Sequence, residues 1–217
     1  MQTVLQKTKV TYLFDPLCGW CYGASPMIQK LGQQTGIDLE LAPTGLFSGA
    51  GARAMNADFA QYAWSNDQRI QKLTGQVFSE NYRTQLLDKP GSRFDSGPGT
   101  LALTAVFLTE PQREAEVLKV LQEARYIHAL DSGQLPLVEK LLRDLGLTAA
   151  TELLSAGGAE LLAANAARMR KAQGLMQSFG AQGVPTLVIT DENGSRLLRG
   201  DALYGRFETL LSHIAAA

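Results

Sequence analysis

The two cysteines of this 217-residue chain, Cys18 and Cys21, stand two residues apart. Two thiols at this spacing on the first turn of a helix can close a disulfide bond, because their Cβ atoms come within bridging reach. Such a pair can also supply half of a metal site, or it can be a coincidence. The surrounding residues decide among these three interpretations.

A metal site is the weaker interpretation. A structural zinc ion usually takes four ligands, from two cysteine pairs or from one pair and two histidines. This chain has one pair, and His128 and His213 lie far apart without metal spacing. Two cysteines are also too few for a disulfide framework in a chain of this length. We therefore expect no bound metal and interpret Cys18 and Cys21 as a redox-active pair.

The residues before the pair place it at the start of a helix. Val10–Phe14 is a β-branched and aromatic run typical of a buried strand, and Asp15-Pro16 ends it with a turn. A helix is predicted from about Cys18 to Gly32, and its free N–H groups and dipole favour a thiolate at its start by roughly 0.3–1 kcal/mol. Cys18 is thus the predicted nucleophile, and Cys21, one turn deeper, is the thiol predicted to resolve the mixed disulfide.

The rest of the chain divides into strand-containing ends and a helical middle. Ile37–Leu41 alternates apolar and polar residues and predicts a second strand, so the chain opens as strand, helix, strand. A third strand is predicted at Thr186–Thr190, with a hairpin turn ending in Asn193-Gly194. We expect one α/β domain formed by residues 1–50 and 180–217, interrupted by an inserted helical domain at residues 51–179.

Several helices are expected outside the first one. Apolar spacing predicts a helix over Arg113–Leu130, another beginning at Pro136, and a closing helix over Ala202–Ile214. Four aromatic residues of the insertion are expected in its core, with a groove lining as the alternative; they are Tyr62, Trp64, Phe78 and Tyr82.

A second motif, Gly183-Val184-Pro185-Thr186, directly precedes the third strand. Together with the cysteine motif, it makes the chain resemble the DsbA-like branch of the thioredoxin superfamily, most closely its FrnE-type predicted disulfide isomerases. The matching segments are YLFDPLCGWCY, LQEARYIHALDSGQ and FGAQGVPTLVI. The resemblance spans nearly the whole chain. It implies a thioredoxin fold with a helical domain inserted after the first βαβ unit, and a cis Val184-Pro185 bond facing the cysteines.

The resemblance also implies a function: reduction or isomerisation of disulfides in protein or peptide substrates. In the family, the residue before the cis-proline offers its backbone to the substrate, a role that falls to Val184 here. Trp20 is expected to be an apolar landing surface for substrate, or else to pack against the insertion. No bound cofactor is implied beyond the Cys18–Cys21 disulfide, with glutathione as a candidate co-substrate.

Two features near the pair depart from the family pattern. Tyr12 stands where thioredoxin-like proteins often carry a buried acid, six residues before the first cysteine. Asp15 is the nearest carboxylate and is interpreted as a turn residue before Pro16 rather than a catalytic group. The dipeptide Gly19-Trp20 contains no histidine to stabilise the thiolate, so a strongly oxidising pair is not expected.

Two other functions stay open. Kappa-class glutathione transferases and 2-hydroxychromene-2-carboxylate isomerases form a neighbouring branch, which typically has serine at the position of Cys18 and lacks the second thiol. A peptide-binding chaperone without redox turnover is the alternative outside enzymes, because Trp20, Val184 and the Gly-Ala-rich loop could form an apolar docking surface.

The composition of the chain limits which kinds of partner are expected. The chain has 20 basic and 21 acidic residues, so nucleic acid is not an expected partner. The densest basic group, Arg168, Arg170 and Lys171, is interpreted as a solvated helix face. No apolar run is long enough to span a membrane, and no secretory signal follows Met1, so we expect a cytoplasmic protein if Met1 is the natural start. The sequence points to no particular recycling partner or oligomeric state.

Overall fold

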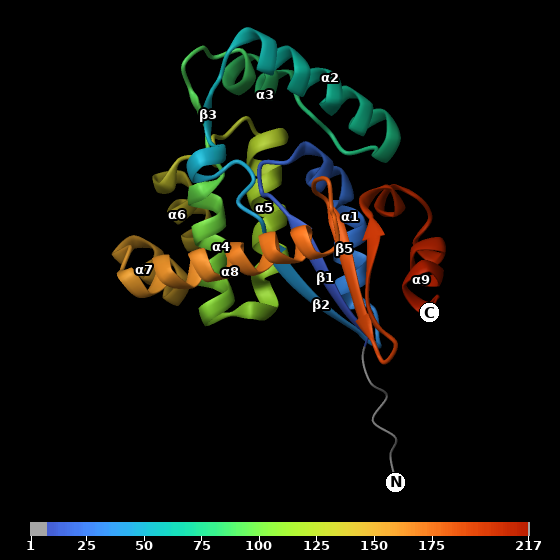
Figure 1. Ribbon diagram of the computed structural model, residues 1–217. Coiled ribbons are helices and arrows are strands. Elements are labelled where there is room, and N and C mark those ends of the chain that lie inside the picture. The colour runs from blue at the N-terminus through green and yellow to red at the C-terminus, as the bar shows by residue number, and fades with distance from the viewer. Residues whose placement is uncertain (1–7, 217) are drawn as a thin grey trace.

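The structure is a computed structural model that describes residues 8–216. A four-stranded sheet lies among helices (Figure 1). Its strands are β1 (Thr8–Phe14), β2 (Ile37–Pro43), β5 (Thr186–Asp191) and β6 (Gly194–Arg199). The α-helices are α1 (Gly19–Gln33), α2 (Ala57–Thr74), α3 (Glu80–Tyr82), α4 (Gly97–Thr109), α5 (Glu114–Tyr126), α6 (Leu135–Asp144), α7 (Thr148–Ala156), α8 (Ala159–Ser178) and α9 (Phe207–Ala215). Shorter elements are β3 (Arg53–Ala54), β4 (Arg93–Phe94), the π-helical turn η2 (Arg83–Leu87) and the 3-10 turns η1 (Gly49–Gly51), η3 (Pro111–Arg113) and η4 (Gly200–Tyr204).

The strand order in the main sheet is β2-β1-β5-β6. β1 and β2 are parallel, and β5 and β6 are antiparallel to their neighbours. The hairpin predicted at Asn193-Gly194 is confirmed: Gly194 has φ +118°, a conformation that favours glycine. In sequence, α2 to α8 all lie between β2 and β5, which confirms a helical insertion after the first βαβ unit. The domain limits at residues 51 and 179 stay a prediction.

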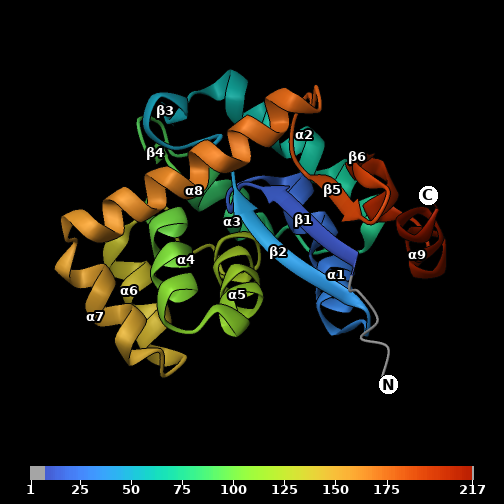
Figure 2. The same cartoon turned by 60° about the horizontal axis from the view of Figure 1, so that its bottom comes forward.

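Both faces of the sheet are covered by helices (Figure 2). On one face, Tyr12 and Phe14 of β1 belong to the same buried cluster as Ile28 of α1. On the other face, Leu13 of β1 clusters with Ala172 of α8. Alternate residues of a strand point to opposite faces, so the end of β1, Tyr12–Phe14, is apolar at successive positions because both faces are covered there.

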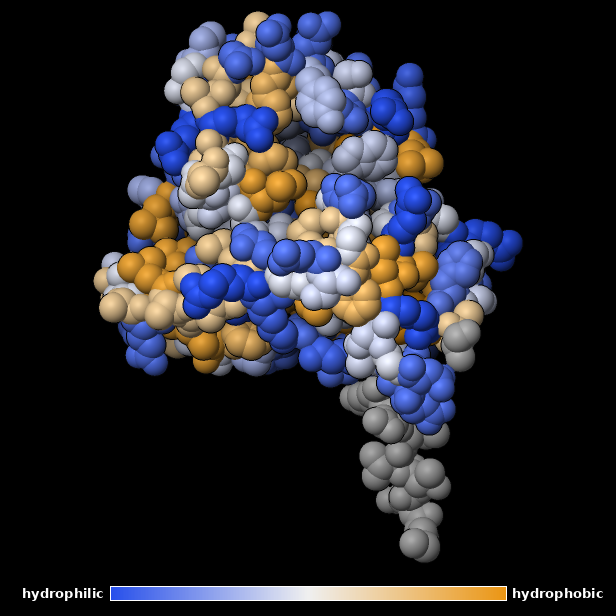
Figure 3. Space-filling model, viewed as in Figure 1, coloured by the Kyte–Doolittle hydropathy of each residue, from blue (hydrophilic) through white to orange (hydrophobic). Residues whose placement is uncertain are grey.

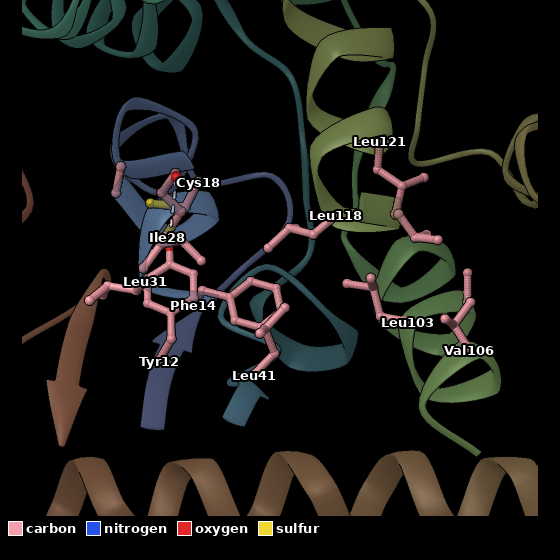
Figure 4. Close-up of a cluster of buried hydrophobic side chains, with 14 of the residues drawn as sticks. Tyr12, Phe14, Cys18, Ile28, Leu31, Leu41, Leu103, Val106, Leu118 and Leu121 are labelled. Atoms are coloured by element: carbon pink, nitrogen blue, oxygen red, sulfur yellow. Dashed lines mark hydrogen bonds between the residues drawn. The ribbon is translucent and has the colours of Figure 1, made fainter. Parts of the chain in front are cut away.

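The main hydrophobic core is shared between the sheet and the insertion. Figure 4 shows Tyr12, Phe14 and Leu41 of the strands on one side and Leu103 of α4 and Leu118 of α5 on the other. All five side chains are at most 7% exposed. The inserted helices therefore pack directly against the strands that carry the cysteine motif.

Two predicted helices have different limits in the structure. The helix expected over Arg113–Leu130 ends at Tyr126, because the Leu130 N–H donates back to the Ala124 carbonyl and Ala129 takes a positive φ of 55°. This backward hydrogen bond is typical of a helix that closes in a left-handed turn.

The closing helix expected over Ala202–Ile214 is also different. Its first part is the 3-10 turn η4, and the α-helix begins only at Phe207. Gly205 separates the two with an extended backbone. The Tyr204 hydroxyl donates to the Trp20 carbonyl at 2.9 Å, and this long-range contact fixes η4 against α1.

The prediction that Arg168 lies on a solvated helix face is wrong. Its guanidinium donates to the Glu114 carboxylate at 2.6 Å, the Leu41 carbonyl at 2.9 Å and the Thr104 hydroxyl at 3.2 Å. It also lies 4.2 Å from the centre of the Phe107 ring. Arg168 thus connects α8 to β2, α4 and α5.

Helices α1 and α2 are in close contact because α1 carries glycines at its interface. An added Cβ at Gly23 would lie 2.5 Å from the Ile70 side chain of α2. Replacing Gly23 with alanine is therefore expected to lower the free energy of unfolding by about 1–3 kcal/mol, the usual cost of overpacking. Denaturant unfolding followed by circular dichroism measures the change.

Gly32→Ala, on the same helix, is the matched control. A Cβ there would meet Leu39 at an ordinary 3.5 Å, so the helix propensity of alanine should raise stability by roughly 0.5–1 kcal/mol. Equal effects of the two substitutions would contradict the close contact between α1 and α2.

Candidate active site

The cysteine motif follows a tight turn at the end of β1. The Cys18 N–H donates to the Asp15 carbonyl at 3.1 Å, and Pro16 occupies the turn position that its fixed φ favours. Cys18 is the N-cap of α1, and its carbonyl accepts the first helical hydrogen bond, from the Tyr22 N–H at 3.0 Å. The predicted placement of Cys18 at the positive end of a helix dipole is therefore confirmed.

The two thiols differ in burial. Both are unpaired, and Cys18 is 7% exposed while Cys21 is 0% exposed. Burial, together with the neighbouring Cys18, raises the pKa of Cys21 well above its ordinary value, so this thiol stays protonated at neutral pH. Cys18 is the thiol that lies next to open space.

The Val184-Pro185 bond is cis, as expected from the resemblance, and it lies at the cysteines. The Cys18 thiol donates to the Val184 carbonyl at 3.6 Å, across 166 residues of sequence. The Thr186 hydroxyl donates to the Gly183 carbonyl at 2.8 Å and fixes the loop just before β5. The structure thus brings together the two motifs that the sequence contains at opposite ends.

Tyr12 occupies the inner side of the cysteine pair. Its hydroxyl donates to the Cys21 carbonyl at 3.3 Å, and its ring stacks on Phe14 at 5.2 Å. Burial raises the pKa of Tyr12 well above its ordinary value, so the phenol remains a hydrogen-bond donor at neutral pH. A neutral donor therefore stands at this side of the cysteine pair.

Asp15 is more than a turn residue. It is 0% exposed, and its carboxylate accepts from the Leu17 N–H at 2.9 Å, the Phe47 N–H at 3.1 Å and the Ser96 hydroxyl at 2.8 Å. Burial raises the pKa of Asp15, although these donors counteract the shift. Asp15 ties the loop before Cys18 to the loop after β2 and to the start of α4.

Trp20 is half-buried beside the cysteines. Its ring lies 5.4 Å from that of Tyr204, and the Arg69 guanidinium lies 5.8 Å from its centre. Trp20 therefore contacts the insertion through α2 and also lines open space at the site. Its role as a landing surface for substrate stays a prediction. Tyr204 is a site residue that the sequence did not predict.

Two hollows lie on either side of Trp20 and Val184. The first, which we call the aromatic cavity, has a volume of about 210 Å³ and contains Cys18. Its apolar walls include Phe47, Phe59, Phe94 and Tyr126. The second, the outer groove, has a volume of about 570 Å³ and is bounded by Gly183–Thr186, Gly200, Asp201 and Tyr204. Figure 3 shows hydrophobic side chains gathered between the surface of α2 and that of α8.

The four aromatic residues expected in the core of the insertion differ in how deeply they are buried. Phe78 and Tyr82 are buried, as predicted, and Trp64 is half-buried. Tyr62 is 66% exposed and lines the aromatic cavity, so the core prediction is wrong for it and the groove alternative holds. Tyr62 lies off the buried face of α2 that Ala60, Asp67 and Ile70 form, which explains why it is more exposed than Phe78 and Tyr82.

Asp67 of α2 is the other site residue that the sequence analysis missed. It lines the aromatic cavity with Cys18 and is 4% exposed. Its position had a sequence signal: Asp67 stands in a helical row with Ala60, Ala63 and Ile70, where an apolar residue would be expected. Acidic side chains are rarely buried without a partner, so a carboxyl on the buried face of a helix indicates a structural or chemical role.

The described part of the chain contains neither a metal site nor a membrane-spanning helix. Between residues 8 and 216, no three His, Cys, Asp or Glu side chains are grouped to hold a metal ion. Over the same residues, no helix has the length and hydropathy needed to cross a membrane.

Comparisons with known proteins agree with this geometry. A family model described as a DSBA-like thioredoxin domain matches residues 9–214. The cytosolic disulfide reductase DsbM from Pseudomonas aeruginosa is similar, with a TM-score of 0.83, 29% identity, and coverage of 96% of this chain and 100% of that chain. DsbM solved with GSH gives a TM-score of 0.82 at 30% identity and the same coverage.

A more distant likeness concerns the fold alone. Pseudomonas aeruginosa DsbA has a TM-score of 0.54 and 17% identity, covering 99% of this chain and 83% of that chain. No curated protein matches the sequence.

Proposed function

This chain belongs to the DsbA-like thioredoxin family, and on that premise we propose that it reduces or isomerises disulfides of protein or peptide substrates through Cys18 and Cys21. The family match also confirms the expected thioredoxin fold. The observation that carries the proposal is the 3.6 Å contact between the Cys18 sulfur and the Val184 carbonyl. It supports the proposal because the more exposed thiol lies beside the backbone that we propose binds an extended substrate.

The proposed reaction has two exchange steps. The Cys18 thiolate attacks one sulfur of the substrate disulfide, the substrate S–S bond breaks, and the other substrate sulfur leaves with the electron pair and takes up a proton. The Cys21 thiol then attacks the Cys18 sulfur and passes its proton to the departing substrate sulfur. The substrate gains two electrons, and the protein is left with a Cys18–Cys21 disulfide.

Each neighbouring group has a proposed part in these steps. Val184 and Pro185 hold an extended substrate across Cys18, and Trp20 supports its apolar side chains. The raised pKa of Cys21 keeps this thiol protonated and in reserve until the mixed disulfide has formed. Because burial also keeps the Tyr12 phenol protonated, Tyr12 orients the backbone at Cys21 rather than removing a proton.

Glutathione is the proposed co-substrate that returns the pair to its dithiol form. DsbM, at 30% identity over nearly the whole chain, has been solved with GSH. The outer groove borders Val184 and Pro185, and its volume of about 570 Å³ lies in the range of small-ligand sites. The proposed working compartment is the cytosol, where glutathione keeps such pairs reduced.

A redox titration of the wild-type protein against mixtures of reduced and oxidised glutathione tests the direction of exchange. We expect a midpoint near the cytosolic glutathione potential, about −220 to −260 mV, and NADPH-linked reduction of insulin when glutathione and its reductase are present. A midpoint near that of DsbA, about −120 mV, would indicate an oxidant and contradict the proposal.

Cys21 separates this proposal from the two alternatives left open by the sequence. Conjugation of glutathione to an electrophile that survives Cys21→Ala would indicate a transferase. Suppression of aggregation by the double variant Cys18→Ala/Cys21→Ala would indicate a chaperone.

A further inference from the structure

Asp67 is a buried carboxyl group on the wall of the cavity that contains Cys18. Its Oδ1 atom lies against Gly19, where an added Cβ would be only 2.5 Å away. The first residue between the two cysteines is thus a glycine that leaves room for this carboxyl. Its Oδ2 atom accepts a hydrogen bond from the Tyr82 hydroxyl at 3.1 Å, which fixes the group in place.

The groups that face Asp67 come from three other elements. They are Tyr82 of α3, Arg125 and Tyr126 of α5, and Cys18 at the start of α1. The Arg125 guanidinium lowers the pKa of Asp67 but makes its own ion pair with Asp131 at 3.3 Å. The position of the Asp67 carboxyl is therefore fixed by its hydrogen bond to Tyr82 and by packing, rather than by an ion pair with Arg125.

Resting on the function proposed above, we propose that the Asp67 carboxyl donates the proton taken up by the departing substrate sulfur when Cys18 attacks. A substrate chain held at Val184 places its disulfide over Cys18, so the second sulfur leaves into the cavity that Asp67 lines. The bond from Cys18 to the first substrate sulfur forms, the substrate S–S bond breaks, and Asp67 becomes a carboxylate.

The carboxylate recovers its proton when the pair is reduced again. An incoming glutathione thiol attacks Cys18, the Cys18–Cys21 bond breaks, and the glutathione proton goes to the departing Cys21 sulfur. A second glutathione thiol gives its proton to the Asp67 carboxylate and displaces Cys18 from the mixed disulfide as a thiolate. The cycle leaves oxidised glutathione, the Cys18 thiolate, protonated Cys21 and protonated Asp67, so electrons and protons balance.

Burial raises the pKa of Asp67 to about 7. At neutral pH the group is then close to equally divided between acid and base, which suits a residue that gives and takes a proton in one cycle.

The decisive experiment compares wild type and Asp67→Asn in kcat/KM for the reduction of a peptide disulfide between pH 5.5 and 8.5. Asparagine keeps an oxygen that can accept from Tyr82 but cannot give up a proton. We expect a loss of about tenfold or more at pH 6, where Asp67 is protonated, and little loss at pH 8.5, where it is ionised and no longer a donor. The matched control, Asp58→Asn, changes an exposed carboxyl on the same helix and should match wild type.

A second variant keeps the proposal falsifiable. Tyr82→Phe removes a hydrogen bond that lowers the pKa of Asp67, so the acid-dependent limb of the profile should move to higher pH. The shift of the pH profile in Tyr82→Phe tests the role of Asp67 even if Asp67→Asn folds poorly.

A ratio of wild-type to Asp67→Asn rates that is the same at every pH, or equal to one, would overturn the role of Asp67. Wild-type protein that reduces no disulfide would instead reject the proposed function itself, and with it this role.

Discussion

Cys18→Ser is expected to bring disulfide reduction down to the uncatalysed level, a loss of roughly 10³-fold or more. The serine hydroxyl is not ionised at neutral pH and cannot form the mixed disulfide, whereas the Cys18 sulfur lies at the start of α1 and beside Val184. Insulin reduction coupled to glutathione and its reductase measures the loss. Shuffling of a scrambled disulfide protein should be lost in parallel, because both activities begin with the same attack.

Cys21→Ser is the matched control, since it changes the neighbouring buried thiol by the same single atom. This variant should still attack the substrate but should stop at the mixed disulfide, because the second thiol is missing. Mass spectrometry without reductant should show the protein joined to one substrate peptide. Turnover retained by Cys18→Ser would contradict the proposed order of attack. So would a substrate adduct that forms on Cys21 in Cys18→Ser but not on Cys18 in Cys21→Ser.

Arg168→Met is expected to lower the free energy of unfolding by about 3 kcal/mol at pH 8. Arg168 is the partner of Glu114, whose side chain is 5% exposed, and methionine would leave that carboxylate buried without a cation. The lost hydrogen bonds to Leu41 and Thr104 add to the effect. Urea unfolding followed by circular dichroism measures the change.

The cost of Arg168→Met should depend on pH in a defined direction. Burial raises the pKa of Glu114 to about 7, and Arg168 counteracts this shift, so the pKa rises further in the variant. When the pKa of a carboxyl is higher in the folded than in the unfolded state, its protonation stabilises the fold. This stabilisation is lost as the pH rises through the folded-state pKa. At pH 5 Glu114 is protonated in both folded proteins, so the difference between them should shrink to about 1 kcal/mol.

Two variants separate the charge effect from the loss of packing. Arg170→Met lies on the exposed side of the same helix and should change stability by less than about 0.5 kcal/mol. Adding Glu114→Gln to Arg168→Met removes the unpaired charge and should recover much of the loss at pH 8. A cost of Arg168→Met that is constant from pH 5 to pH 8 would contradict the ion-pair explanation.

Both the fold class and the position of the cysteine pair at the start of a helix could be predicted from the sequence. The apolar run Val10–Phe14 followed by Asp15-Pro16 identified a buried strand and its end, and the helical spacing after Cys18 identified α1. Asn193-Gly194 identified the hairpin between β5 and β6. These features depend on residues close together in the chain, so their patterns are visible without a structure.

Resemblance supplied what local patterns could not. A proline before a strand is ordinary by itself, and only its pairing with the cysteine motif indicated a cis Val184-Pro185 bond at the thiols. The structure places the Val184 carbonyl 3.6 Å from the Cys18 sulfur. The substrate-binding roles of Trp20, Val184 and Pro185 remain proposals.

The residues that surround the pair were decided by tertiary structure. The Trp20 carbonyl and the Tyr204 hydroxyl meet across 184 residues, and Arg168 reaches Glu114 across 54. Asp67 reaches Gly19, and lines the cavity that contains Cys18, because glycines in α1 let α2 approach closely. Hydrophobic spacing tells which face of a helix is buried, but not which helix it meets or which polar group the contact encloses. The sequence by itself thus determined the two cysteine sulfurs and the helix on which they lie, while the packing of the insertion decided the carboxyl, phenol and cavity around them.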